Sequence, residues 1–126
     1  MKKTAKYNWL LVYMYNEWDA GHNDHKRGEK VGVLVERFER NFPKNKIGSA
    51  NDKKMAIAYL RDDSLIEVVD TSGKVINDPN QAYSIGRMKP TQNGRGYLQK
   101  KQEDNTNKVA SEYGTFLSRI FRKGNS

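Results

Sequence analysis

The chain has 126 residues, enough for one domain of ordinary size, and we expect a single domain over residues 1–126. Its 23 lysine and arginine residues against 15 aspartate and glutamate residues give a net charge of +8, which excludes an acidic nucleic-acid mimic and favours polyanionic partners. No cysteine is present, which excludes disulfide frameworks, cysteine-ligated zinc sites and thiol nucleophiles and fits a reducing compartment.

The first apolar segment runs from Trp9 to Tyr15. Aromatic and β-branched residues are enriched in strands, so we expect a strand that is buried on both faces. The run is too short and too aromatic for a secretory signal, and it is far shorter than a membrane span. We therefore expect a cytoplasmic protein with no membrane partner.

A helix is expected from Glu29 to Phe42. Its apolar residues recur three and four positions apart, and Pro43 ends the pattern. A second helix start is expected at Ser49, with Asp52 in the capping-box position. The stretch 55–60 fits either a helix or a strand, because its apolar residues match both periods.

A hairpin is expected next, with a strand over 64–70, a tight turn at 71–73 and a returning strand over 74–77. The order of a helix followed by such a hairpin over residues 51–77 resembles winged-helix DNA-binding domains. The resemblance implies that Lys53 and Lys54 lie at the start of a groove-entering helix and Lys74 on the wing. A meander of three strands explains the same residues.

Residues 78–105 are expected to form a basic, loop-rich segment, because they contain prolines and glycines and few aliphatic residues. A final amphipathic helix is expected from about residue 105, followed by a frayed tail. Together these elements predict an α+β fold, with a small antiparallel sheet and two flanking helices.

The densest run of positive charge lies between Arg87 and Lys101, where no acidic residue occurs. Lysine and arginine neutralise phosphates, an exposed tyrosine can stack on a base, and the glycines of Asn93-Gly94-Arg95-Gly96 leave backbone amides accessible. A solvated surface loop is the alternative explanation. The expected nucleic-acid contacts are Arg87, Lys89, Arg95, Tyr97, Lys100 and Lys101, assisted by Lys44, Lys46, Lys53 and Lys54.

Both histidines fall in one short polar stretch, together with two aspartates. His22, His25 and Asp19 are candidate metal ligands, and His22, His25 and Asp24 are candidate catalytic groups of a small nuclease. The third histidine that many zinc sites require does not occur in the chain. A polar surface loop therefore explains the stretch better, and no cofactor is expected.

These observations predict a small basic protein that binds DNA or RNA and has no catalytic activity. The first alternative is a protein-interaction module of the kind encoded by phages or mobile elements, which acts on a host protein. Small size, absence of a catalytic motif and richness in lysine and asparagine favour that alternative. The second alternative is the small histidine- or metal-dependent nuclease.

Overall fold

The computed structural model describes residues 3–20 and 28–106. These residues form five α-helices, a short 3-10 turn and a two-stranded antiparallel sheet. The expected α+β class therefore holds in the broad sense, but the described part of the chain is mostly helical. Among the described residues, no helix has the length and apolar character to span a membrane.

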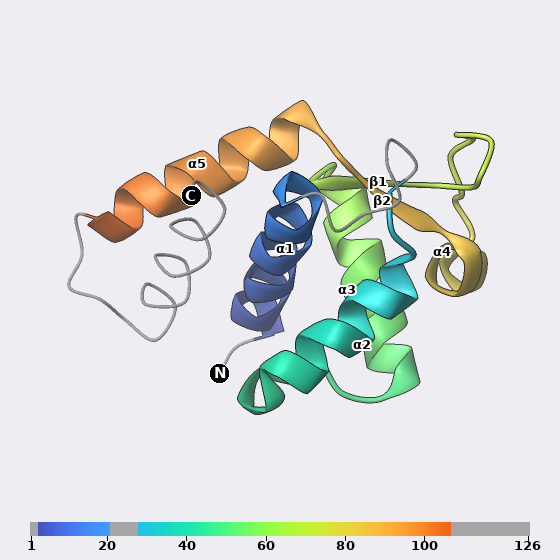
Figure 1. Cartoon of the computed structure of the whole chain (residues 1–126), viewed down its shortest axis with the longest axis horizontal. Helices are drawn as coiled ribbons and strands as arrows, with labels where there is room; N and C mark the ends of the chain where they lie inside the picture. Colours follow the sequence, from blue (N-terminus) through green and yellow to red (C-terminus); the bar gives the residue numbers. More distant parts are fainter. Residues whose placement is uncertain (1–2, 21–27, 107–126) are drawn as a thin grey trace.

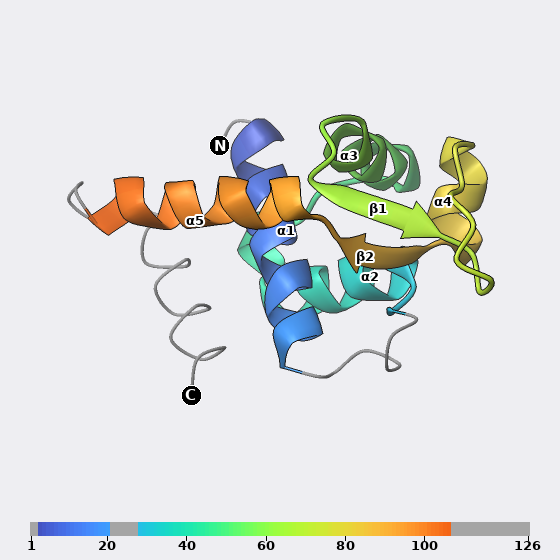
Figure 2. The ribbon, with the colours of Figure 1, turned by 90° about the horizontal axis from the view of Figure 1, so that it is seen from above.

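The first element is helix α1 (Lys3–Asp19), so the strand predicted over Trp9–Tyr15 is wrong. Each of these seven residues is buried, with exposed fractions between 0% and 5%. Figures 1 and 2 show the reason, because α1 lies in the middle of the described elements with α2, α3 and α5 around it. A helix covered on several sides has an uninterrupted apolar run, which periodicity does not distinguish from a buried strand.

Helix α2 (Val31–Asn41) confirms the helix predicted over 29–42. Its inner side is fully buried, and the Phe38 ring packs against Tyr13 of α1, with ring centroids 5.5 Å apart. A 3-10 turn, η1 (Pro43–Asn45), follows where Pro43 ends the helix.

Helix α3 (Ala50–Asp62) begins with the predicted capping box. The Asp52 backbone N–H donates to Ser49 Oγ at 3.2 Å, and the Ser49 backbone N–H donates to Asp52 Oδ2 at 3.0 Å. Residues 55–60 are helical and bury Ala56, Ile57 and Leu60, so the meander that required a strand here is wrong.

Strand β1 (Ile66–Val69) pairs antiparallel along its whole length with β2 (Arg87–Pro90), whereas residues 74–77 form no strand. The turn is present, with Gly73 at φ 90°, but the returning segment contributes only a bridge from Val75 to Val69. Pairing follows burial: β2 places Met88 in the core opposite Val68, whereas most side chains of 74–77 are exposed. A second bridge joins Lys30 to Arg87 at the other edge of β2.

The prediction that residues 78–105 are loop-rich is also wrong. They form helix α4 (Pro79–Ile85), strand β2 and helix α5 (Gln92–Thr106). Helix α4 starts with Asp78 as cap and Pro79 at the first position, a pattern typical of a helix start. Helix α5 has almost no apolar residues and therefore no amphipathic pattern. The helix predicted beyond Thr106 and the tail lie outside the described residues.

Candidate nucleic-acid interface

Two arginines of the predicted Arg87–Lys101 site have partners within the protein. Arg87 Nη1 donates to the Gly28 carbonyl at 2.8 Å, which ties β2 to the segment before α2. Arg95 forms a bidentate ion pair with Asp19 at the end of α1, at 2.8 and 3.1 Å. The Arg95 guanidinium also lies 5.2 Å from the centroid of the Tyr15 ring. Both arginines are therefore engaged by the protein itself.

Tyr97 is half-buried, and its hydroxyl donates to Asn8 Oδ1 on α1 at 2.8 Å. Burial raises the pKa of Tyr97. The Lys101 ammonium lies 5.6 Å from the centroid of the tyrosine ring. A base that stacks on this ring would have to compete with these intramolecular contacts.

The glycines of this segment lie in the first two turns of α5 and do not form a phosphate-binding loop. The Gly94 N–H donates to Thr91 Oγ1 at 2.8 Å, so this amide is part of the helix cap. The cations of the segment with exposed residues and no ion pair to a described residue are Lys89 on β2 and Lys100 on α5. The predicted site is thus divided between structural and solvent-facing residues.

Lys53, on α3, also has a structural partner. Its ammonium lies 3.0 Å from Glu39 Oε1 on α2, and Glu39 Oε2 accepts the Ile47 N–H at 2.8 Å and the Gly48 N–H at 3.3 Å. Burial alone would raise the pKa of Glu39, but the Lys53 ammonium and the two backbone N–H groups outweigh it and hold this pKa below its usual range. The Glu39 carboxylate therefore fixes the connection between α2 and α3.

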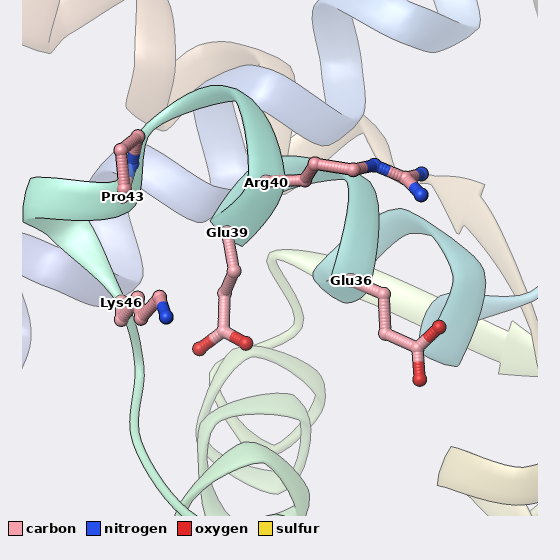
Figure 3. Close-up of a pocket in the computed structure, with 5 residues that line it drawn as sticks. All are labelled: Glu36, Glu39, Arg40, Pro43 and Lys46. Carbon is pink, nitrogen blue, oxygen red and sulfur yellow. The ribbon is translucent and has the colours of Figure 1, made fainter.

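A pocket adjoins this connection, and both signs of charge line it: Glu36, Glu39, Arg40, Pro43 and Lys46. Figure 3 shows Glu39 and Lys46 on the same side of α2, while the Arg40 side chain points away from them. The Glu39 carboxylate already has its three partners. The pocket consequently offers no concentrated positive charge to a phosphate.

The outward face of α3 is the residue set that sequence reasoning missed. It lies on the side of the helix opposite Ala56, Ile57 and Leu60, and it carries Asn51, Met55, Ala58 and Asp62. Figure 2 shows α3 at the border of the described elements, with the sheet and α2 on its inner side. The capping box was the available signal, because a fixed helix start determines which later residues face outward.

Three lysines lie close to the start of α3 along the chain. Lys44 and Lys46 lie exposed in the connection before α3, and Lys54 is half-buried within the helix. Within the part of the chain that the structure describes, none of the three forms an ion pair. We call the first half of this face together with these lysines the α3 surface, which consists of Asn51, Met55, Lys44, Lys46 and Lys54.

Of the candidate metal and catalytic residues, the structure describes only Asp19, which pairs with Arg95. His22, Asp24 and His25 lie outside the described residues. Over residues 3–20 and 28–106, no three histidine or acidic side chains are grouped closely enough to hold a metal ion.

The α3 surface combines ammonium groups, an amide and an apolar thioether. The ammonium groups can contact phosphates, and the amide and the thioether can contact base edges.

Comparison of the chain with protein families, curated proteins and solved structures finds no match.

Proposed function

We propose that the protein binds nucleic acid, without catalysing a reaction on it, through the α3 surface. The observation that carries the proposal is the combination of an outward helix face with lysines that have no described ion-pair partner. Such lysines are available to phosphates, whereas Arg87, Arg95 and Lys53 already have partners in the protein. Phosphate contacts supply most of the affinity of non-specific binding.

The order of the elements supports the same proposal. The elements follow one another in the order found in winged-helix DNA-binding domains. That order is helix α1, the bridged residue Lys30, helices α2 and α3, and then strands β1 and β2. In helix-turn-helix proteins the second helix of the pair enters the major groove while the first crosses the backbone. Helix α3 would be that second helix, and residues 70–86, which include α4, separate the two strands.

Removal of the three lysines of the α3 surface is expected to weaken binding without unfolding the protein. Each phosphate contact contributes about 0.9 to the slope of log K against log salt on duplex DNA, so Lys44, Lys46 and Lys54 changed together to Ala should lower that slope by roughly 2 to 3. Fluorescence anisotropy with a labelled duplex, in a salt series from about 50 to 200 mM, measures the change.

The matched control is the change of Lys89, Lys100 and Lys101 to Ala, which removes the same charge from β2 and α5. This control should leave most of the slope in place. A control variant that loses more of the slope than the α3 variant would place the site on the Arg87–Lys101 segment. Wild-type protein that does not bind at low salt would contradict the proposal and favour a protein partner.

A further inference from the structure

We propose that Asn51 and Met55 read an A·T base pair in the major groove, so that the protein is a sequence-specific binder of duplex DNA. This inference rests on the proposed function and assigns base recognition to two residues of the α3 surface. Both lie in the first half of α3, four positions apart, and therefore on the same side of the helix.

Asn51 is the polar side chain at the start of α3 that the fold leaves available. Ser49 and Asp52 bond to one another in the capping box, and Lys53 pairs with Glu39. Asn51 is exposed, and among the described residues its amide makes one weak contact, from Nδ2 to Met55 Sδ at 3.7 Å. An amide carries both a donor and an acceptor, which is the pattern that pairs with N6 and N7 of adenine.

Met55 would supply the apolar contact with the same base pair. It is 48% exposed, although methionine is a residue that proteins usually bury. The major-groove edge of an A·T pair presents adenine N7 and N6 at one end and the thymine methyl group at the other. The neighbouring amide and thioether of Asn51 and Met55 offer the corresponding pair of groups, one polar and one apolar.

Duplex DNA fits this face better than a single strand does. A single strand is held by stacking on exposed aromatic rings. Tyr97 is engaged through both its hydroxyl and its ring, and the Tyr59 ring of α3 packs against Tyr7, with ring centroids 5.1 Å apart. The charges also orient the helix, because Lys44 and Lys46 precede it and Lys54 lies in its first half, whereas Asp62 and Asp63 lie at its end. Phosphates attract the first half and repel the end, so the half with Asn51 and Met55 enters the groove.

The test begins with selection of duplexes from a random library by the full chain, followed by measurement of affinity for the selected site. Wild-type protein should select an A·T pair at a fixed position. In that site, 7-deazaadenine removes N7 and deoxyuridine removes the thymine methyl group. The first change should weaken wild-type binding about 10-fold, and the second should weaken it by a smaller factor.

The variants assign these losses to residues. Asn51→Ala should bind ordinary DNA about 10-fold more weakly and should no longer respond to 7-deazaadenine. Met55→Ala should no longer respond to deoxyuridine. The matched controls Asn80→Ala and Ile85→Ala alter an exposed asparagine and an exposed apolar residue of α4, and they should bind as wild type does.

Three results would overturn the inference: selection without an A·T preference, wild-type binding that neither analogue weakens, or an Asn51→Ala variant that stays as sensitive to 7-deazaadenine as wild type. The analogue experiment uses wild-type protein, so it decides the question even where a variant does not fold. Salt-dependent duplex binding without base preference would reject this inference alone, whereas no binding at all would reject the proposed function.

Discussion

Gly94→Ala is expected to destabilise the protein by about 2 to 3 kcal/mol, the upper part of the range for overpacked sites. A Cβ atom at this position would overlap the Tyr15 hydroxyl and the Leu65 carbonyl oxygen. That hydroxyl donates to Leu65 O at 2.5 Å and accepts from the Thr91 N–H at 3.0 Å. The added methyl group therefore separates α1 from the start of β1 and the end of β2.

Gly96→Ala is the matched control, because it makes the same change two residues later in the same helix. Apart from its chain neighbours and the backbone of α5, no atom of residues 3–20 and 28–106 lies within 4 Å of its Cβ position, so alanine should stabilise α5 by up to about 1 kcal/mol through its higher helix propensity. Urea denaturation measures both free energies of unfolding. Equal effects of the two substitutions would show that the contact of α5 with Tyr15 is not formed.

Glu39→Ala is expected to lower the free energy of unfolding by about 2 to 3 kcal/mol near neutral pH. The substitution leaves two backbone N–H groups and the Lys53 ammonium without their acceptor. Glu36→Ala is the control on the same helix, because Glu36 is exposed. Substitution of an exposed residue should change stability by no more than about 0.5 kcal/mol.

The loss of stability caused by Glu39→Ala should also depend on pH. The pKa of Glu39 is lower in the folded protein than its ordinary value, so the unfolded chain takes up the proton first as the pH falls. The stabilisation by the carboxylate is therefore complete above the unfolded value of about 4.3 and is lost as the pH falls through the folded value. Denaturation series should show the difference between wild type and variant shrinking below about pH 4. A difference that is constant down to pH 3 would contradict the role of the charge.

The sequence predicts α2 and the start of α3 well, because both obey local rules. One face of α2 is apolar at helical spacing, and the capping box at Ser49 involves residues only three positions apart. The wrong predictions share one cause, because they concern contacts between residues that are distant in the sequence. Helix α1 is surrounded on several sides, and β1 takes its partner from residues 87–90, beyond an intervening helix. No local pattern reports either arrangement.

The same cause explains the division of the predicted binding segment. Charge density along the chain identifies the basic residues but not their partners, and the acid that engages Arg95 lies 76 positions away. The residue that engages Lys53 belongs to α2, before the turn. Asn51 and Met55 gave no signal in the sequence, because an exposed side chain becomes informative only when the orientation of its helix is known.

Chemical-shift mapping by NMR tests most directly the claim that the α3 surface binds nucleic acid. Titration of isotope-labelled protein with a duplex at low salt should shift the backbone amide signals of residues 44–58, and should shift those of α5 much less. Shifts concentrated in β2 and α5, or no shifts at a saturating duplex concentration, would contradict the account.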